Sequence, residues 1–144
     1  MSSTAAAAAA RIAREFIRSN KVMVFSKSYC PYCHHVKVAL DGRKIEYKAL
    51  ELDKESNGSA IQSALQEITG QRTVPNIFAN GYHVGGCDDT LAALENGQFK
   101  KHLENDKVGP YAAEEGKKDE PESSKKDKQP SSTKTESISD KAQL

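Results

Sequence analysis

The chain has 144 residues, which is enough for one domain and short for two. Its 21 Lys and Arg nearly balance its 20 Asp and Glu, so the composition lacks the concentrated charge that binds nucleic acids or membrane surfaces. Three cysteines cannot all pair within one chain, and no apolar run of about 18 residues is present that could cross a membrane. We therefore expect one domain that works as a monomer, with neither nucleic acid nor membrane as a partner.

The N-terminal segment allows two interpretations. Residues 1–18 are rich in Ala and contain three Arg and one Glu, a composition that mitochondrial transit peptides also have. Ala is the best helix former, and Ile12, Phe16 and Ile17 fall on one helical face. We favour a first helix of the domain in a cytoplasmic protein, with mitochondrial import left open.

Hydrophobic periodicity predicts alternating helices and strands after this segment. In chain order we expect a strand over 22–26, a helix over 32–40, a strand over 45–52, a helix around 61–68, a hairpin of 75–79 and 82–84, and helical segments around 91–94 and 99–103. The hairpin is predicted by Asn80-Gly81 between two apolar runs. A strand–helix–strand unit gives a parallel pair and the hairpin an antiparallel pair. The predicted fold is therefore α/β, with one mixed sheet of about four strands flanked by helices.

The character of the sequence changes after residue 109. From Glu114 onward the chain has no aromatic residue and only two large aliphatic residues, Ile138 and Leu144. Such a segment cannot bury enough apolar surface to offset the entropy of ordering its backbone. We therefore divide the chain into a domain over residues 1–109 and a disordered polar tail over residues 110–144.

Cys30 and Cys33 are separated by two residues and precede a predicted helix. A bridge between them would close almost no loop, so the pair is more typical of redox or metal chemistry than of a structural disulfide. Free backbone N–H groups and the helix dipole favour a thiolate on Cys30, and Lys27 adds a positive charge. Pro31 suits the first helical position, where its missing N–H costs nothing. We predict that Cys30 is the nucleophile and that Cys33, about one turn further in, resolves the mixed disulfide.

Three segments together resemble the dithiol class of the glutaredoxin family: Lys27–Cys33 (KSYCPYC), Thr73–Pro75 (TVP) and Gly85–Asp89 (GGCDD). They follow the order of that family within residues 10–107. The resemblance implies a thioredoxin-like fold and a glutathione-dependent thiol–disulfide oxidoreductase with a redox-active Cys30–Cys33 disulfide. Glutathione would be the cosubstrate, no cofactor would be bound permanently, and the protein partners would be glutathionylated or disulfide-containing proteins.

The resemblance also implies how glutathione binds. Pro75 would be cis, and the backbone of Val74 would pair with the cysteinyl part of the tripeptide. Backbone N–H groups of Cys87 and Asp88 would meet the γ-glutamyl carboxylate, and Asp88 or Asp89 would hold its ammonium group. The expected glutathione-binding residues are Lys27, Tyr32, Gln62, Arg72, Thr73, Val74, Pro75, Cys87, Asp88 and Asp89. Of these, the family assigns the glycyl carboxylate to the residues at positions 27, 62 and 72.

The same cysteines are also compatible with other kinds of site. An iron–sulfur cluster bridging two glutaredoxins is the alternative function, although relatives that bind one typically lack Pro31 or the second cysteine. Cys30-x-x-Cys33-His34 also matches c-type haem attachment, but the chain has no export signal, and a zinc site lacks its usual second ligand pair. A thioredoxin is expected to carry Trp beside its cysteines, and this chain has no Trp. Cys87 is either a regulatory thiol or simply the first residue of a helix, and both interpretations stay open.

Overall fold

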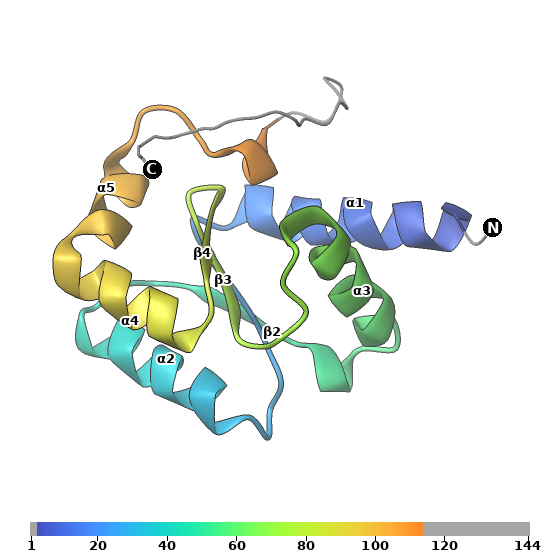
Figure 1. Cartoon of the computed structure of the whole chain (residues 1–144), viewed down its shortest axis with the longest axis horizontal. Helices are drawn as coiled ribbons and strands as arrows, with labels where there is room; N and C mark the ends of the chain where they lie inside the picture. The colour runs from blue at the N-terminus through green and yellow to red at the C-terminus, as the bar shows by residue number, and fades with distance from the viewer. Residues whose placement is uncertain (1–2, 114–144) are drawn as a thin grey trace. The chain divides into compact units, whose positions relative to one another are not determined.

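The computed structural model describes residues 3–113, which form one sheet with helices on both of its faces (Figure 1). The elements are α1 (Ser3–Ser19), β1 (Val22–Ser26), α2 (Pro31–Gly42), β2 (Lys48–Glu51), the 3-10 helix η1 (Leu52–Lys54), α3 (Gly58–Thr69), β3 (Asn76–Ala79), β4 (Tyr82–Gly85), α4 (Cys87–Asn96), α5 (Gln98–Glu104) and the 3-10 helix η2 (Pro110–Ala112). No helix within these residues combines the length and the apolar character that crossing a membrane requires.

The sheet is mixed and four-stranded, as predicted, with the strand order β2-β1-β3-β4. β1 and β2 are parallel and are joined through α2, whereas β3 runs antiparallel to both β1 and β4. The predicted hairpin forms at Asn80 and Gly81, whose φ angles are 52° and 81°. Positive φ at both central residues is what a two-residue hairpin turn needs, and Asn-Gly meets this requirement with little strain.

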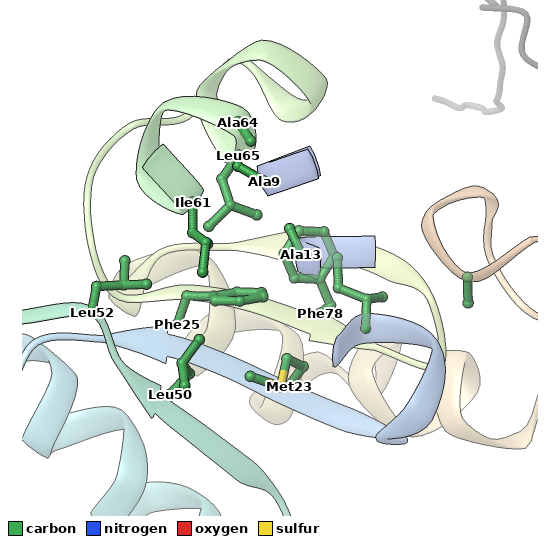
Figure 2. Packing of buried hydrophobic residues seen from close by; sticks show 12 residues of the cluster. Ala9, Ala13, Met23, Phe25, Leu50, Leu52, Ile61, Ala64, Leu65 and Phe78 are labelled. Carbon is green, nitrogen blue, oxygen red and sulfur yellow. The ribbon is translucent and has the colours of Figure 1, made fainter. Parts of the chain in front are cut away.

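Alternation along β1 divides the core between the two faces of the sheet. Met23 and Phe25 belong to the cluster that the sheet forms with α1 and α3, which also includes Phe78 and Leu65 (Figure 2). Val22, Val24 and Ile77 belong to the other face, together with buried residues of α2, α4 and α5. Because both faces of this strand are buried, VMVFS reads as a continuous apolar run rather than an alternating one.

Several predicted element boundaries differ from the observed ones, most clearly those of the second strand and of the second helix. The second strand is shorter than the predicted 45–52, because β2 pairs with β1 only from Met23↔Lys48 to Ser26↔Glu51, where β1 itself ends. Helix α2 is longer than the predicted 32–40 and runs over Pro31–Gly42. The first helix is present as favoured, and its fully buried face consists of Ala9, Ala13 and Ile17.

The domain boundary predicted after residue 109 falls too early. η2 packs on the domain, where Ala112 is only 8% exposed and the Tyr111 hydroxyl donates a hydrogen bond to the Ile68 carbonyl at 3.1 Å. The chain can reach this position because Gly109 and Gly81 lie so close that neither has room for a side chain. The one aromatic residue of the predicted tail therefore belongs to the folded domain, and residues 114–144 of that tail lie outside the described residues.

Two helical glycines differ in the space around them and provide a test of the packing between α3 and η1. A Cβ at Gly58 would overlap the carbonyl oxygen of Leu52, whereas nothing lies within 4 Å of a Cβ at Gly42. We expect Gly58→Ala to lower the free energy of unfolding by about 1–3 kcal/mol, because backbone has to move. Gly42→Ala should leave it unchanged or raise it by up to about 1 kcal/mol. Urea denaturation measures both, and equal effects of the two substitutions would contradict this account.

Candidate active site

Cys30 is the N-cap residue of α2. It has extended backbone angles (φ −88°, ψ 117°), and its Sγ accepts a hydrogen bond from the Cys33 N–H at 3.3 Å. Pro31 occupies the start of the helix, as predicted. A second bond, from the Cys30 N–H to the Lys27 carbonyl at 3.0 Å, closes the turn before the helix. A negative charge on this sulfur is stabilised both by the N–H that it accepts from and by the positive end of the helix dipole.

Cys33 lies one turn further along α2 in a different environment. Its side chain is fully buried, and burial, followed by its hydrogen bond with Cys30, raises the pKa of the thiol to about 12. The Lys27 backbone and the Lys37 charge act in the opposite direction but do not cancel this effect. All three cysteines are free thiols, so the described state is the reduced one. The pair therefore consists of a partly exposed capping thiol and a sheltered neutral thiol.

A second chain segment faces Cys30 from across the site. The peptide bond between Val74 and Pro75 is cis, as predicted, and β3 begins directly after it. The Val74 carbonyl oxygen lies 3.9 Å from Cys30 Sγ. Sheet register produces this proximity, because Phe25 near the end of β1 pairs with Asn76 at the start of β3.

A pocket of about 460 Å³ lies between this segment and the N-terminus of α4. α4 begins at Cys87 with Gly86 as its N-cap residue, so its first free N–H groups border the pocket. The strand before it ends at Gly85, where φ is 121° and a side chain would collide with Asp89. The pocket is lined by Tyr32, Gln71, Thr73, Val74, Pro75, Gly86, Cys87, Asp88 and Asp89.

Seven of the ten predicted glutathione-binding residues line this pocket, and the residues at positions 27, 62 and 72 do not. Gln62 donates from Nε2 to the Arg72 carbonyl at 2.8 Å. The Arg72 guanidinium instead contacts Ser63 and Gln66 on α3, at 3.4 and 3.3 Å. Both side chains are engaged with α3 and the loop after it, and their role toward glutathione stays a prediction, as does that of Lys27.

Sequence analysis missed two lining residues, Gln71 and Gly86. Gly86 stands inside the motif that was recognised and is the N-cap residue of α4. Gln71 precedes Thr73 by two residues, but nothing in its residue type points to the pocket. The short distance in sequence between Gln71 and the Thr73–Pro75 motif was the only signal that could have pointed to the pocket.

Cys87 is half-buried at the start of α4. Burial first, and then the negative charges of Asp88 and Cys30, raise the pKa of its thiol. The N-terminal position of this thiol therefore does not make it acidic. A regulatory thiol and a helix-start residue both remain compatible with this environment.

Comparison with known proteins gives a consistent picture. The family model described as Glutaredoxin matches residues 22–84. The chain is 59% identical over 86 residues to a glutaredoxin of Ricinus communis, covering 60% of this chain and 84% of that protein. It is 57% identical over 87 residues to Glutaredoxin-C6 of Oryza sativa subsp. japonica, covering 60% and 78%. A crystal structure of a buckwheat glutaredoxin–glutathione complex matches with a TM-score of 0.69 and 43% identity, covering 72% of this chain and 94% of that one. These matches confirm the predicted thioredoxin-like fold.

The difference between the two active-site thiols predicts selective alkylation. In the native protein we expect iodoacetamide to modify Cys30 first and to leave Cys33 unmodified between about pH 7 and about pH 9, because a thiol with a pKa near 12 stays protonated there. Peptide mass spectrometry after timed quenching identifies the modified residue. Unfolding in guanidinium chloride is the control and should make both residues reactive, and native labelling of Cys33 at the rate of Cys30 would refute the assignment.

Proposed function

Because this chain belongs to the glutaredoxin family of thiol–disulfide oxidoreductases, we propose that it uses glutathione to reduce protein–glutathione mixed disulfides and protein disulfides. In this proposal Cys30 is the nucleophile and Cys33 is the resolving thiol. Glutathione is the cosubstrate and binds in the pocket between the Thr73–Pro75 segment and the start of α4.

One observation carries this proposal, namely the position of Cys30 at a helix N-terminus and next to Val74, which lines the pocket. Its sulfur accepts the Cys33 N–H and lies 3.9 Å from the Val74 carbonyl oxygen at the wall of the pocket. A thiolate at this place can reach a disulfide sulfur whose glutathionyl half lies along Val74. The similar buckwheat protein, whose structure is described as a glutaredoxin–glutathione complex, supports glutathione as the ligand.

The reaction of a glutathionylated protein takes two exchange steps. The Cys30 thiolate attacks the glutathione sulfur, so that a Cys30–glutathione disulfide forms and the protein leaves as a thiolate that takes a proton from water. The thiolate of a second glutathione then attacks the glutathione sulfur of this intermediate. The products are oxidised glutathione and the regenerated Cys30 thiolate. One free glutathione thiol is consumed, and the other half of the oxidised glutathione is the glutathionyl group that came with the substrate.

Protein disulfides need Cys33 in addition. Attack by Cys30 leaves one protein sulfur bound to Cys30, and Cys33 then loses its proton and attacks the Cys30 sulfur. This step releases the second protein thiol and forms the Cys30–Cys33 disulfide, which two glutathione molecules reduce. In the reduced protein, burial keeps Cys33 protonated near neutrality, so Cys30 and not Cys33 makes the first attack.

The iron–sulfur alternative has no observation in its favour beyond the family itself. Within residues 3–113, no group of three or more His, Cys, Asp or Glu side chains is arranged to hold a metal ion. A cluster shared between two copies of the chain and glutathione would not need three such side chains from one chain. The alternative is therefore tested by experiment. Visible absorption after anaerobic purification would favour the cluster over the oxidoreductase as the main activity.

Single substitutions of the two thiols test the proposed roles. We expect Cys30→Ser to lose at least about 1,000-fold in deglutathionylation rate, because a hydroxyl is not ionised near neutrality. Cys33→Ser should keep deglutathionylation within a few-fold of the parent protein and lose reduction of protein disulfides. The measurement is turnover coupled to glutathione reductase, with a glutathionylated peptide and a disulfide-linked protein as substrates. Full activity of Cys30→Ser would disprove the proposed mechanism.

A further inference from the structure

The side-chain amide of Gln71 bridges two backbone carbonyls of the segment that faces Cys30. Its Nε2 donates to the Thr73 carbonyl at 3.2 Å and to the Pro75 carbonyl at 3.1 Å. The Gln71 backbone is itself fixed, because its N–H donates to Thr69 Oγ1 at 3.0 Å. Gly70, in the left-handed conformation at φ 84°, ends α3 just before it. The amide therefore extends from the end of a helix, and both of its N–H donors are used on one short segment.

In this arrangement Gln71 does not bond the carbonyl of Val74, the residue between Thr73 and Pro75, and that carbonyl faces the active site. The carbonyls of Thr73 and Pro75 accept from Gln71, whereas the Val74 carbonyl faces Cys30 Sγ at 3.9 Å. Pro75 has no N–H, so the segment cannot be held there by a backbone donor of its own. The Gln71 amide supplies donors where the strand ladder, which begins at Asn76, does not.

Gln71 also lies close to the opposite wall of the pocket. A Cβ on Gly86 would come within 3.8 Å of Gln71 Nε2 and within 3.6 Å of the Pro75 carbonyl oxygen. The amide nitrogen, which is bonded to the Thr73–Pro75 segment, is thus also near the residue that caps α4. Gln71 therefore hydrogen-bonds one wall of the pocket and lies near the other, and it is itself part of the pocket lining.

We propose that Gln71 is a positioning residue that fixes the backbone of Val74 in the direction that binds the glutathionyl group. This inference rests on the proposed function, because it assigns to Gln71 a part in glutathione recognition at the same site. The effect belongs to binding and not to the sulfur chemistry, since Cys30 is held separately by α2 through the Cys33 N–H. Loss of the amide donors should therefore act on KM for the glutathionylated substrate.

Two substitutions of similar length separate hydrogen bonding from shape. Gln71→Met fills the same space without donors, and we expect it to raise KM for a glutathionylated peptide about five- to tenfold with kcat within about twofold of the parent. Gln71→Glu offers only acceptors to the two carbonyls and should raise KM further. Gln98→Met is the matched control on exposed surface at the start of α5, and it should leave both constants unchanged.

A second measurement, the rate at which iodoacetamide alkylates Cys30, separates positioning from general damage. It should stay within about twofold in both Gln71 variants, because the cap of α2 does not involve Gln71. An unchanged KM in Gln71→Met would overturn the inference, as would a fall in kcat and alkylation rate that parallels the rise in KM. Turnover of the glutathionylated peptide by the parent protein tests the proposed function separately. If the parent protein shows no turnover, the proposed function is wrong, whatever the variants do.

Discussion

The hydrogen bond from the Cys33 N–H to Cys30 Sγ, at 3.3 Å, is the contact on which the site depends. It places the sulfur of the proposed nucleophile and stabilises negative charge on it at the same time, because the donor is a free N–H of the first turn of a helix. The turn that precedes α2 is fixed by a residue distant in sequence, because the Ser28 N–H donates to an Asp53 carboxylate oxygen at 2.9 Å. The position of the Cys30 sulfur and the stabilisation of charge on it therefore both depend on the residue at which α2 begins.

The same helix gives its two cysteines opposite properties. One turn of α2 carries the chain from a partly exposed cap to the buried face of the helix, where Cys33 lies in line with Val36 and Leu40. Desolvation favours the neutral form of a buried thiol, so Cys33 is protonated near neutrality in the reduced protein. The asymmetry that a dithiol mechanism needs follows from the amphipathic character of the helix and requires no additional catalytic group.

Sheet register assembles the rest of the site. Pairing of Phe25 with Asn76 brings the segment before β3 to the loop after β1, and pairing of Ile77 with Gly85 brings the start of α4 to the same edge. Three segments that are distant in sequence therefore end at one pocket. Gln71 is hydrogen-bonded to the segment before β3, which explains why a residue outside all three motifs belongs to the pocket lining.

The sequence by itself determined the order and type of the elements, and it predicted redox chemistry for the cysteine pair. Asn80-Gly81 predicted the hairpin, Cys30 with Pro31 predicted the helix start, and both follow from preferences of neighbouring residues that need no distant contact. Only the tertiary structure decided which side chains reach the pocket, because that depends on strand register and on the rotamers that packing selects. Gln71 turns into the pocket while Arg72, the next residue, turns toward α3, and no local pattern distinguishes these two directions.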